Sequence, residues 1–132
     1  MNKSYKLSVI FCLLNLTFLS SCCKSTYSFK GSYFRNKNDV QDVVIIDKKK
    51  YRRYIIDSNN NDTLLSFENH YVTDNNSIHL KGFYQCFDSV DLIKSSNVEN
   101  SLHTTGFYIN KSIFGKITIE GAKGVIFEKI NN

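Results

Sequence analysis

Proline and tryptophan are absent from this chain of 132 residues, glycine occurs six times, and cysteine occurs four times. Without proline the chain cannot use that residue to block pairing at an exposed sheet edge, so a sheet must protect its edges by other means, such as closure. The longest apolar stretch, residues 7–19, has thirteen residues, whereas a transmembrane helix needs about 20. So few cysteines also exclude a scaffold built on disulfides.

The first 21 residues have the composition of an export signal. Lys3 and Lys6 precede the apolar stretch, and small residues separate that stretch from Cys22. The sequence Leu19-Ser20-Ser21-Cys22 resembles the lipobox of bacterial lipoproteins, in which an aliphatic residue and two small residues precede an acylated cysteine. The resemblance implies cleavage between Ser21 and Cys22 and a lipid anchor on Cys22 that holds the protein at a membrane.

These features divide the chain into a signal peptide (1–21), a lipidated tether (22–26) and one β domain (27–132). A plain secretory signal with an unmodified Cys22 is the alternative. In some Gram-negative bacteria an aspartate after the acylated cysteine retains a lipoprotein at the inner membrane. Cys23 stands at that position, so the resemblance favours the outer membrane over the inner membrane.

The net charge of the mature chain and its remaining cysteines bear on which kinds of partner and which covalent links are expected. Removal of residues 1–21, which carry two of the 17 basic residues, leaves 15 basic and 12 acidic side chains and a net charge of +3. This charge is too small to indicate nucleic-acid binding. The remaining thiols, Cys23 and Cys86, either pair with each other or leave Cys86 as a small buried residue in an apolar stretch.

Apolar residues that alternate with a period of two predict an all-β fold with about eight short antiparallel strands. Ten phenylalanines and eight tyrosines also favour strands. Within residues 89–101, Val90, Leu92 and Ile93 are expected to begin a short helical turn or a further strand, and residues 95–100 are expected to form a loop. We expect a meander that closes into a small barrel or a strongly curved sheet, because closure removes unprotected edges. The expected strands are 27–34, 43–46, 51–56, 64–73, 78–87, 102–110, 113–120 and 125–130.

Four segments of the chain resemble the small lipocalin-like β domains of uncharacterised lipoproteins from Gram-negative bacteria. They are residues 31–33, 43–54, 115–119 and 125–130. The resemblance implies a barrel whose interior is either filled by side chains or open to one small apolar ligand. The Gly-x-Trp motif of lipocalins is missing, since the chain has no tryptophan.

A cluster of cations at an expected hairpin is the main candidate for contact with a membrane or an acidic partner. The alternative interpretation is a solvated turn that discourages pairing between sheet edges. The cluster consists of Lys48, Lys49, Lys50, Arg52 and Arg53.

Candidates for chemistry are sparse. His70, His79 and His103 lack the spacing of metal ligands, so no metal site and no cofactor is expected. The carboxylate pairs at positions 39 and 42 and at positions 88 and 91 have no histidine beside them, so no catalytic site is expected.

The sequence therefore predicts a membrane-anchored lipoprotein that presents a β-barrel binding or interaction module in the cell envelope. Its partner would be an envelope protein or a small apolar ligand, and not a nucleic acid. The alternative is a structural, immunity or inhibitor-type protein that binds another protein, which predicts a filled barrel with a charged protruding turn. A hydrolytic enzyme would need a polar cleft and is the least favoured class.

Overall fold

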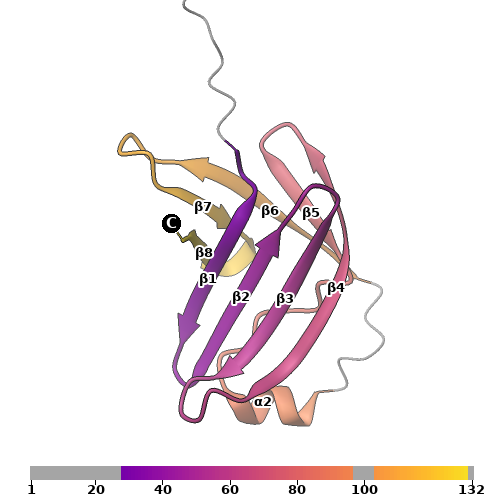
Figure 1. Ribbon diagram of the computed structural model, residues 1–132, viewed down its shortest axis with the longest axis vertical. Coiled ribbons are helices and arrows are strands. Elements are labelled where there is room, and N and C mark those ends of the chain that lie inside the picture. Colours follow the sequence, from indigo (N-terminus) through magenta and orange to yellow (C-terminus); the bar gives the residue numbers. More distant parts are fainter. Residues whose placement is uncertain (1–27, 97–102, 131–132) are drawn as a thin grey trace, which may run out of the picture.

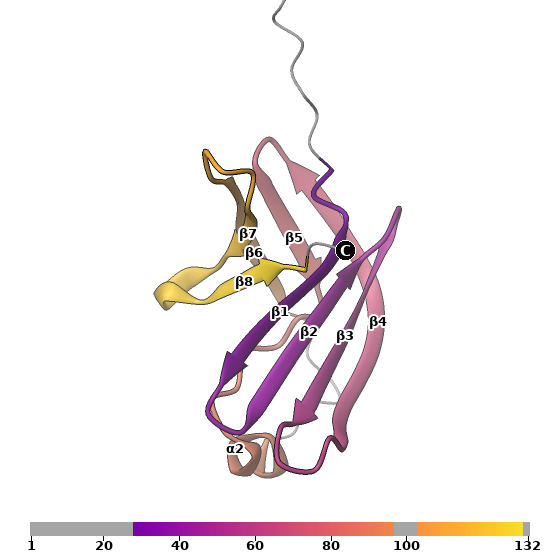
Figure 2. The ribbon, with the colours of Figure 1, turned by 60° about the vertical axis from the view of Figure 1, so that its left-hand side comes forward.

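The computed structural model describes residues 28–96 and 103–130, which form a closed antiparallel barrel (Figures 1 and 2). The strands follow one another around the barrel in sequence order. The expected all-β meander of eight strands is therefore confirmed, and so is its closure. The expected signal peptide and tether, with Ser21, Cys22 and Cys23, lie outside the described residues, as does Tyr27.

Each strand pairs with its neighbour in sequence, and β1 also pairs with β8 through Tyr33–Lys129 and Phe34–Glu128. A helix of six residues, α2 (Val90–Ser95), lies between β5 and β6, so of the two alternatives for Val90, Leu92 and Ile93 the helical turn is the one that forms. A short 3₁₀ segment, η1 (Ala122–Gly124), joins the last two strands. The strands are β1 (Gly31–Lys37), β2 (Val40–Ile46), β3 (Lys50–Asp57), β4 (Thr63–Asp74), β5 (Ser77–Lys81), β6 (Thr104–Lys111), β7 (Ile117–Glu120) and β8 (Ile126–Lys129).

Because the strands form a meander, successive turns alternate between the two ends of the barrel. The β2–β3, β4–β5 and β6–β7 turns lie at the end where the described chain begins at Ser28, and both views show them projecting in that direction (Figures 1 and 2). We call this the N-terminal end. The β1–β2 and β3–β4 turns and α2 lie at the opposite end.

Aromatic side chains fill the middle of the barrel. Five aromatic side chains there are each at most 2 % exposed: Tyr33, Tyr51, Phe83, Phe107 and Phe127. The Phe83, Phe107 and Phe127 rings meet edge to face, with centroids 5.1 to 6.3 Å apart, a geometry that aromatic pairs prefer. A second apolar cluster joins Val90 and Ile93 of α2 to Phe87, Val40 and Ile55. The interior, which the sequence left either open or filled, is occupied by side chains.

Two strands are about half as long as predicted, and the first strand runs from Gly31 to Lys37 instead of over 27–34. The expected strand 78–87 ends at Lys81, because Gly82 adopts a positive φ of 71° and turns the chain across the barrel. We call residues 82–89 the crossing segment; its Phe83 and Phe87 are buried. The expected strand 113–120 begins only at Ile117, and Ile113 and Phe114 lie in the β6–β7 turn.

Candidate functional site

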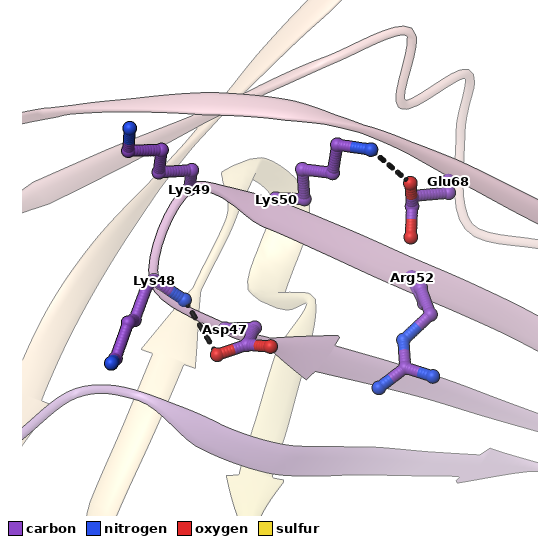
Figure 3. Close-up of a pocket in the computed structure, with 6 residues that line it drawn as sticks. All are labelled: Asp47, Lys48, Lys49, Lys50, Arg52 and Glu68. Carbon is purple, nitrogen blue, oxygen red and sulfur yellow. Dashed lines mark hydrogen bonds and ion pairs between the residues drawn. The ribbon is translucent and has the colours of Figure 1, made fainter.

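The turn between β2 and β3 carries the cations that the sequence singled out. Lys48 and Lys49 form this turn and are exposed. Two hydrogen bonds fix it: the Asp47 backbone N–H donates to the Lys50 carbonyl at 2.9 Å, and the Lys48 N–H donates to Asp47 Oδ1 at 2.7 Å. Both lysine side chains therefore project from a well-defined turn (Figure 3).

One lysine of this cluster is already neutralised. Lys50 Nζ lies 2.6 Å from Glu68 Oε1 on the neighbouring strand β4 (Figure 3). This hydrogen bond, more than the nearby positive charges of Lys50, Arg52 and His70, lowers the pKa of Glu68. Within residues 28–96 and 103–130, Lys48, Lys49 and Arg52 form no ion pair, so their charges remain available to an anionic surface.

A tyrosine braces the turn from the side. The Tyr71 hydroxyl donates to the Asp47 carbonyl at 2.7 Å and lies 3.2 Å from the Lys48 carbonyl. Its ring meets Phe29 edge to face at 6.0 Å, which brings the start of the described chain beside the turn. Partial burial raises the pKa of Tyr71, and the negative charge of Asp47 adds to this effect. Tyr71 therefore stays a neutral hydrogen-bond donor.

Two hollows flank the turn and share Lys48 and Lys49 as their common wall. One, of about 520 Å³, is lined by Asp47, Lys50, Arg52 and Glu68 in addition to the two lysines. The other, of about 480 Å³, is lined by Phe29, Lys30, Tyr71, Val72 and Thr73 together with the same lysines. Both open to solvent, so the geometry suits contact with a surface better than enclosure of a small molecule.

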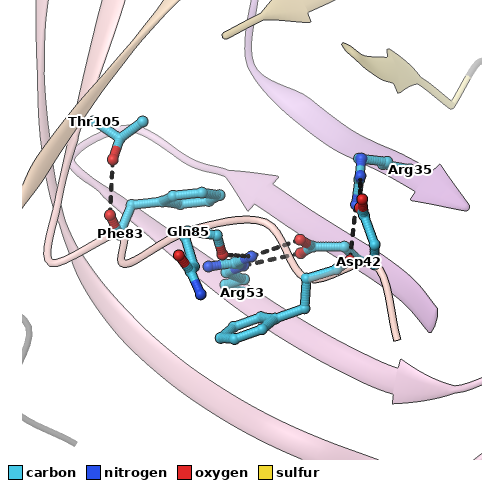
Figure 4. A network of polar contacts seen from close by, with 8 residues as sticks. Arg35, Asp42, Arg53, Phe83, Gln85 and Thr105 are labelled. Atoms are coloured by element: carbon cyan, nitrogen blue, oxygen red, sulfur yellow. Dashed lines mark hydrogen bonds and ion pairs between the residues drawn. The ribbon is translucent and has the colours of Figure 1, made fainter. Parts of the chain in front are cut away.

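The prediction that Arg53 lies on this surface together with the other cations is wrong. Its side chain is fully buried, because alternation along β3 turns Arg52 outward and Arg53 inward. Arg53 Nε donates to Asp42 Oδ1 at 2.9 Å and Nη2 donates to Oδ2 at 2.6 Å, a bidentate ion pair inside the barrel (Figure 4). Its guanidinium lies 3.8 Å from the centroid of the Phe83 ring.

The ion pair secures the crossing segment against the barrel wall. Arg53 Nη2 also donates to the Gln85 carbonyl at 2.7 Å, and Arg35 Nη1 donates to the Phe87 carbonyl at 3.0 Å (Figure 4). Arg35 forms a further ion pair with Asp88. Backbone carbonyls that leave the sheet at Gly82 thus find cationic donors, as buried polar groups require.

The spacing of the carboxylates does not bring them together for chemistry. Asp42 accepts from Arg53, and Asp88 accepts from Arg35. Asp39 instead accepts a hydrogen bond at 3.3 Å from the backbone N–H of Val90, the first residue of α2. Each of these carboxylates has a structural partner of its own.

A signal for the buried pair is present in the sequence. Along β2 the buried residues are Val40, Asp42, Val44 and Ile46, so the carboxylate shares the apolar phase of its strand. On the adjacent strand the guanidinium shares the phase of Tyr51 and Ile55. Opposite charges on the inner phase of two neighbouring strands predict a buried ion pair.

A third, smaller hollow lies beside the crossing segment. It has a volume of about 270 Å³, just below the roughly 300–1,000 Å³ of typical ligand pockets. Burial, helped by the negative charge of Asp42, raises the pKa of the Cys86 thiol in its wall to about 11. At neutral pH this thiol is protonated and therefore a poor nucleophile. The lining residues are Phe83, Tyr84, Gln85, Cys86, Thr105, Phe107, Gly121, Ala122, Lys123 and Val125.

The three histidines are dispersed: His70 lies on β4, His79 on β5, and His103 just before β6. In the part of the chain that the structure describes, no group of three or more His, Cys, Asp or Glu side chains is arranged to hold a metal ion. Nor do residues 28–96 and 103–130 contain a helix with the length and apolarity needed to cross a membrane.

Fold and site together define a small β-barrel with a filled interior, a buried ion pair and a basic turn at one end. No protein-family model, curated protein or solved structure matches this chain. The functional argument therefore rests on the residues and their geometry.

Proposed function

We propose that this protein is a membrane-anchored lipoprotein of the cell envelope and that its barrel is an interaction module that works through its outer surface. The observation that carries the proposal is the filled interior. Tyr33, Tyr51, Phe83 and Phe127 occupy the middle of the barrel with at most 1 % exposure, and the three hollows described above open outward.

The filled interior favours an external partner over a small apolar ligand. A ligand in the barrel would have to displace the Phe83 ring and expose the Arg53 guanidinium that packs against it. It would also break the hydrogen bond between Arg53 and the Gln85 carbonyl. Leaving a buried hydrogen-bond donor unsatisfied costs about 1–3 kcal/mol, which a small apolar molecule would have to offset by its own contacts.

The proposed anchor is supported by the lipobox resemblance of Leu19-Ser20-Ser21-Cys22. Covalent geometry limits the reach of an acylated Cys22: its six-residue connection to Ser28 spans at most about 20 Å. The N-terminal end of the barrel would therefore stay within that distance of the bilayer surface. Cys23 after the acylated residue favours the outer membrane.

Mass spectrometry of the mature protein tests the anchor. We expect a chain that begins at Cys22 and carries acyl groups on it. Cys22→Ser should abolish acylation and keep residues 1–21, whereas Cys23→Ser, the matched control one position away, should be processed like the parent protein. An unmodified Cys22, or residues 1–21 retained in the mature parent protein, would contradict the proposal.

Affinity purification from detergent-solubilised envelopes tests the interaction module. We expect one envelope protein to co-purify in stoichiometric amount. Recovery of the protein with no stoichiometric companion would count against an interaction module.

A second candidate, an immunity or inhibitor-type protein, is favoured by one specific observation, the charged β2–β3 turn that projects from a filled barrel. In that case Lys48 and Lys49 would contact an acidic protein. Lys48→Ser with Lys49→Ser would then lose the co-purified protein, while Lys94→Ser, on α2 at the opposite end, would retain it. Retention by all variants would exclude this role for the turn.

A further inference from the structure

The β6–β7 turn exposes the two most accessible large apolar side chains of the described residues. Ile113 is 94 % exposed and Phe114 is 92 % exposed, and they are adjacent at the tip. Single exposed apolar residues are common on protein surfaces. Two neighbours that contact almost nothing, at the tip of a projecting turn, instead indicate a contact that the isolated barrel does not make.

This turn is well defined by its own hydrogen bonds. The Ser112 N–H donates to the Lys116 carbonyl at 2.8 Å, the Gly115 N–H donates to the Ser112 carbonyl at 3.0 Å, and the Lys116 N–H donates to Ser112 Oγ at 3.1 Å. Gly115 supplies the positive φ of 83° that the reversal needs. The backbone thus holds Ile113 and Phe114 outward, away from the core.

Lysines flank the apolar pair. Lys111 ends β6 and Lys116 precedes β7, and the Lys116 ammonium lies 2.8 Å from the Glu128 carboxylate. The exposed apolar pair matches the boundary of a bilayer, where acyl chains take up apolar groups. Because Glu128 already pairs with Lys116, contact with anionic headgroups falls to Lys48 and Lys49 of the β2–β3 turn.

The turn lies at the N-terminal end of the barrel. The β2–β3 turn, with Lys48 and Lys49, projects from another part of the same rim, and the described chain begins at Ser28 at this end too (Figures 1 and 2). The meander requires this arrangement, because every second turn returns to the end where the first strand begins. Apolar insertion, cationic contact and the tether would therefore all act on one side of the molecule.

We propose that the β6–β7 turn inserts Ile113 and Phe114 into the interfacial region of a bilayer that contains anionic lipid, while Lys48 and Lys49 contact its headgroups. A bilayer surface is broad and can meet turns on separate parts of one rim at the same time. This docking rests on the proposed anchor for its tether, and it points α2 and the opposite end of the barrel away from the membrane.

Single tryptophan reporters test the docking, because the chain has no tryptophan of its own. Phe114→Trp places the reporter at the proposed insertion point. Leu92→Trp is the control: Leu92 is 52 % exposed on α2, at the opposite end. The full-length protein is reconstituted in vesicles of phosphatidylglycerol and phosphatidylcholine whose acyl chains carry bromine as a quencher. We expect fluorescence at position 114 to be lost and fluorescence at position 92 to be retained. Equal quenching at both positions, or none at either, would overturn the proposal.

Lipid charge and the lysines are varied next, in the Phe114→Trp background. Each cation near an anionic membrane contributes about 1 kcal/mol, about a fivefold change in an equilibrium constant. We therefore expect Lys48→Ser with Lys49→Ser to weaken quenching of the reporter at position 114, and Lys94→Ser at the opposite end to leave it unchanged. Equal quenching in pure phosphatidylcholine would overturn the headgroup contact.

Mass spectrometry of Cys22 on the same samples separates the two proposals. An acylated Cys22 with an unquenched reporter at position 114 would overturn docking and leave the anchor intact. An unmodified Cys22 with a quenched reporter would overturn the anchor and support docking. If the reporter were shielded from aqueous iodide in native envelopes but not in pure lipid vesicles, the β6–β7 turn would belong to a protein partner and the bilayer proposal would be overturned.

Discussion

Arg52 and Arg53 are neighbours in sequence with opposite environments, one exposed on the barrel surface and one fully buried. Burying a charge is costly, and a buried ion pair offsets that cost only when its geometry is good and its remaining donors find partners. The bidentate contact with Asp42 and the bond to the Gln85 carbonyl meet most of this requirement, while Nη1 has no hydrogen-bond partner among the described residues. The packing of the guanidinium against Phe83 accommodates that unbonded side.

Arg53→Ala should lower the free energy of unfolding by about 3–5 kcal/mol, because it leaves the Asp42 carboxylate buried without its partner. Arg52→Ala, the same change one residue away, should alter it by no more than about 0.5 kcal/mol. Urea denaturation of both variants measures the difference. A double variant, Asp42→Leu with Arg53→Met, should recover much of the loss, since it removes both charges. Similar effects of the two single changes would show that the buried pair contributes little.

Cys86 and Tyr51 should make the barrel sensitive to alkali. Burial raises the pKa of Cys86 from 9.0 to about 11 and raises the pKa of Tyr51 well above its ordinary value. The unfolded chain releases these protons at lower pH than the folded chain. The stabilising contribution of Cys86 is therefore complete below about pH 9 and is lost as pH rises through 11, whereas that of Tyr51 begins to be lost only above about pH 10. For Cys86 the linkage amounts to about 3 kcal/mol. Urea midpoints measured across this range should fall, and should fall less steeply in Cys86→Ala. An unchanged slope in that variant would exclude the thiol as a cause.

At the level of elements, alternation predicted the hairpin of β2 and β3 well, because both strands bury every second residue. The same pattern failed at the crossing segment, where Phe83 and Phe87 continue the apolar character of β5 beyond Lys81. What removes this segment from the sheet is the positive φ at Gly82 and the bond from Arg53 to the Gln85 carbonyl. Local periodicity does not encode a contact between positions 32 residues apart.

The candidate site, like the strands, could be predicted only in part from the sequence. A hairpin with a charged turn predicts that four of the cations lie close together, and the structure brings them around one surface hollow. They are Lys48, Lys49, Lys50 and Arg52. Ile113 and Phe114 were placed in a strand, because apolar residues next to the alternating run 117–120 extend its pattern. Their position at the same end as the basic turn depends on the number and order of the strands, which only the closed topology supplies.

Two phenylalanines provide a matched test of the crossing segment and the β6–β7 turn. Phe83 is fully buried, whereas Phe114 is 92 % exposed. Phe83→Ala should cost about 3–5 kcal/mol of unfolding free energy, because it leaves a cavity among Tyr51, Phe107 and Phe127. Phe114→Ala should cost no more than about 0.5 kcal/mol. A large loss from Phe114→Ala would mean that its ring packs against the barrel, and would remove the basis for inserting it into a bilayer.

At the scale of the whole molecule, the barrel is closed by the short pairing of β1 with β8, which we call the seam. The β1 strand pairs with β2 along its full length, from Gly31–Ile46 to Lys37–Val40, but it pairs with β8 only at Tyr33 and Phe34. Beyond the ladder, the Ile130 N–H donates to the Ser32 carbonyl at 2.8 Å and Lys129 Nζ donates to the Ser28 carbonyl at 2.7 Å. The seam thus joins the end of the barrel sheet to the point where the chain leaves toward the proposed anchor.

Native-state hydrogen exchange should detect this seam. Amides of β8 and of the β7–β8 connection should exchange through local opening at a lower free energy than amides of β2 and β3. The reason is that β2 and β3 pair with long strands on both sides and bury the apolar cluster. Lys129→Ser removes the bond to the Ser28 carbonyl and should accelerate exchange in β8, while Lys123→Ser on the nearby exposed turn should not. Equal protection in β8 and β3 would mean that the barrel opens only as a whole. In that case a pull on the tether at Ser28 would be resisted by the entire core, and local separation of β1 from β8 would not occur.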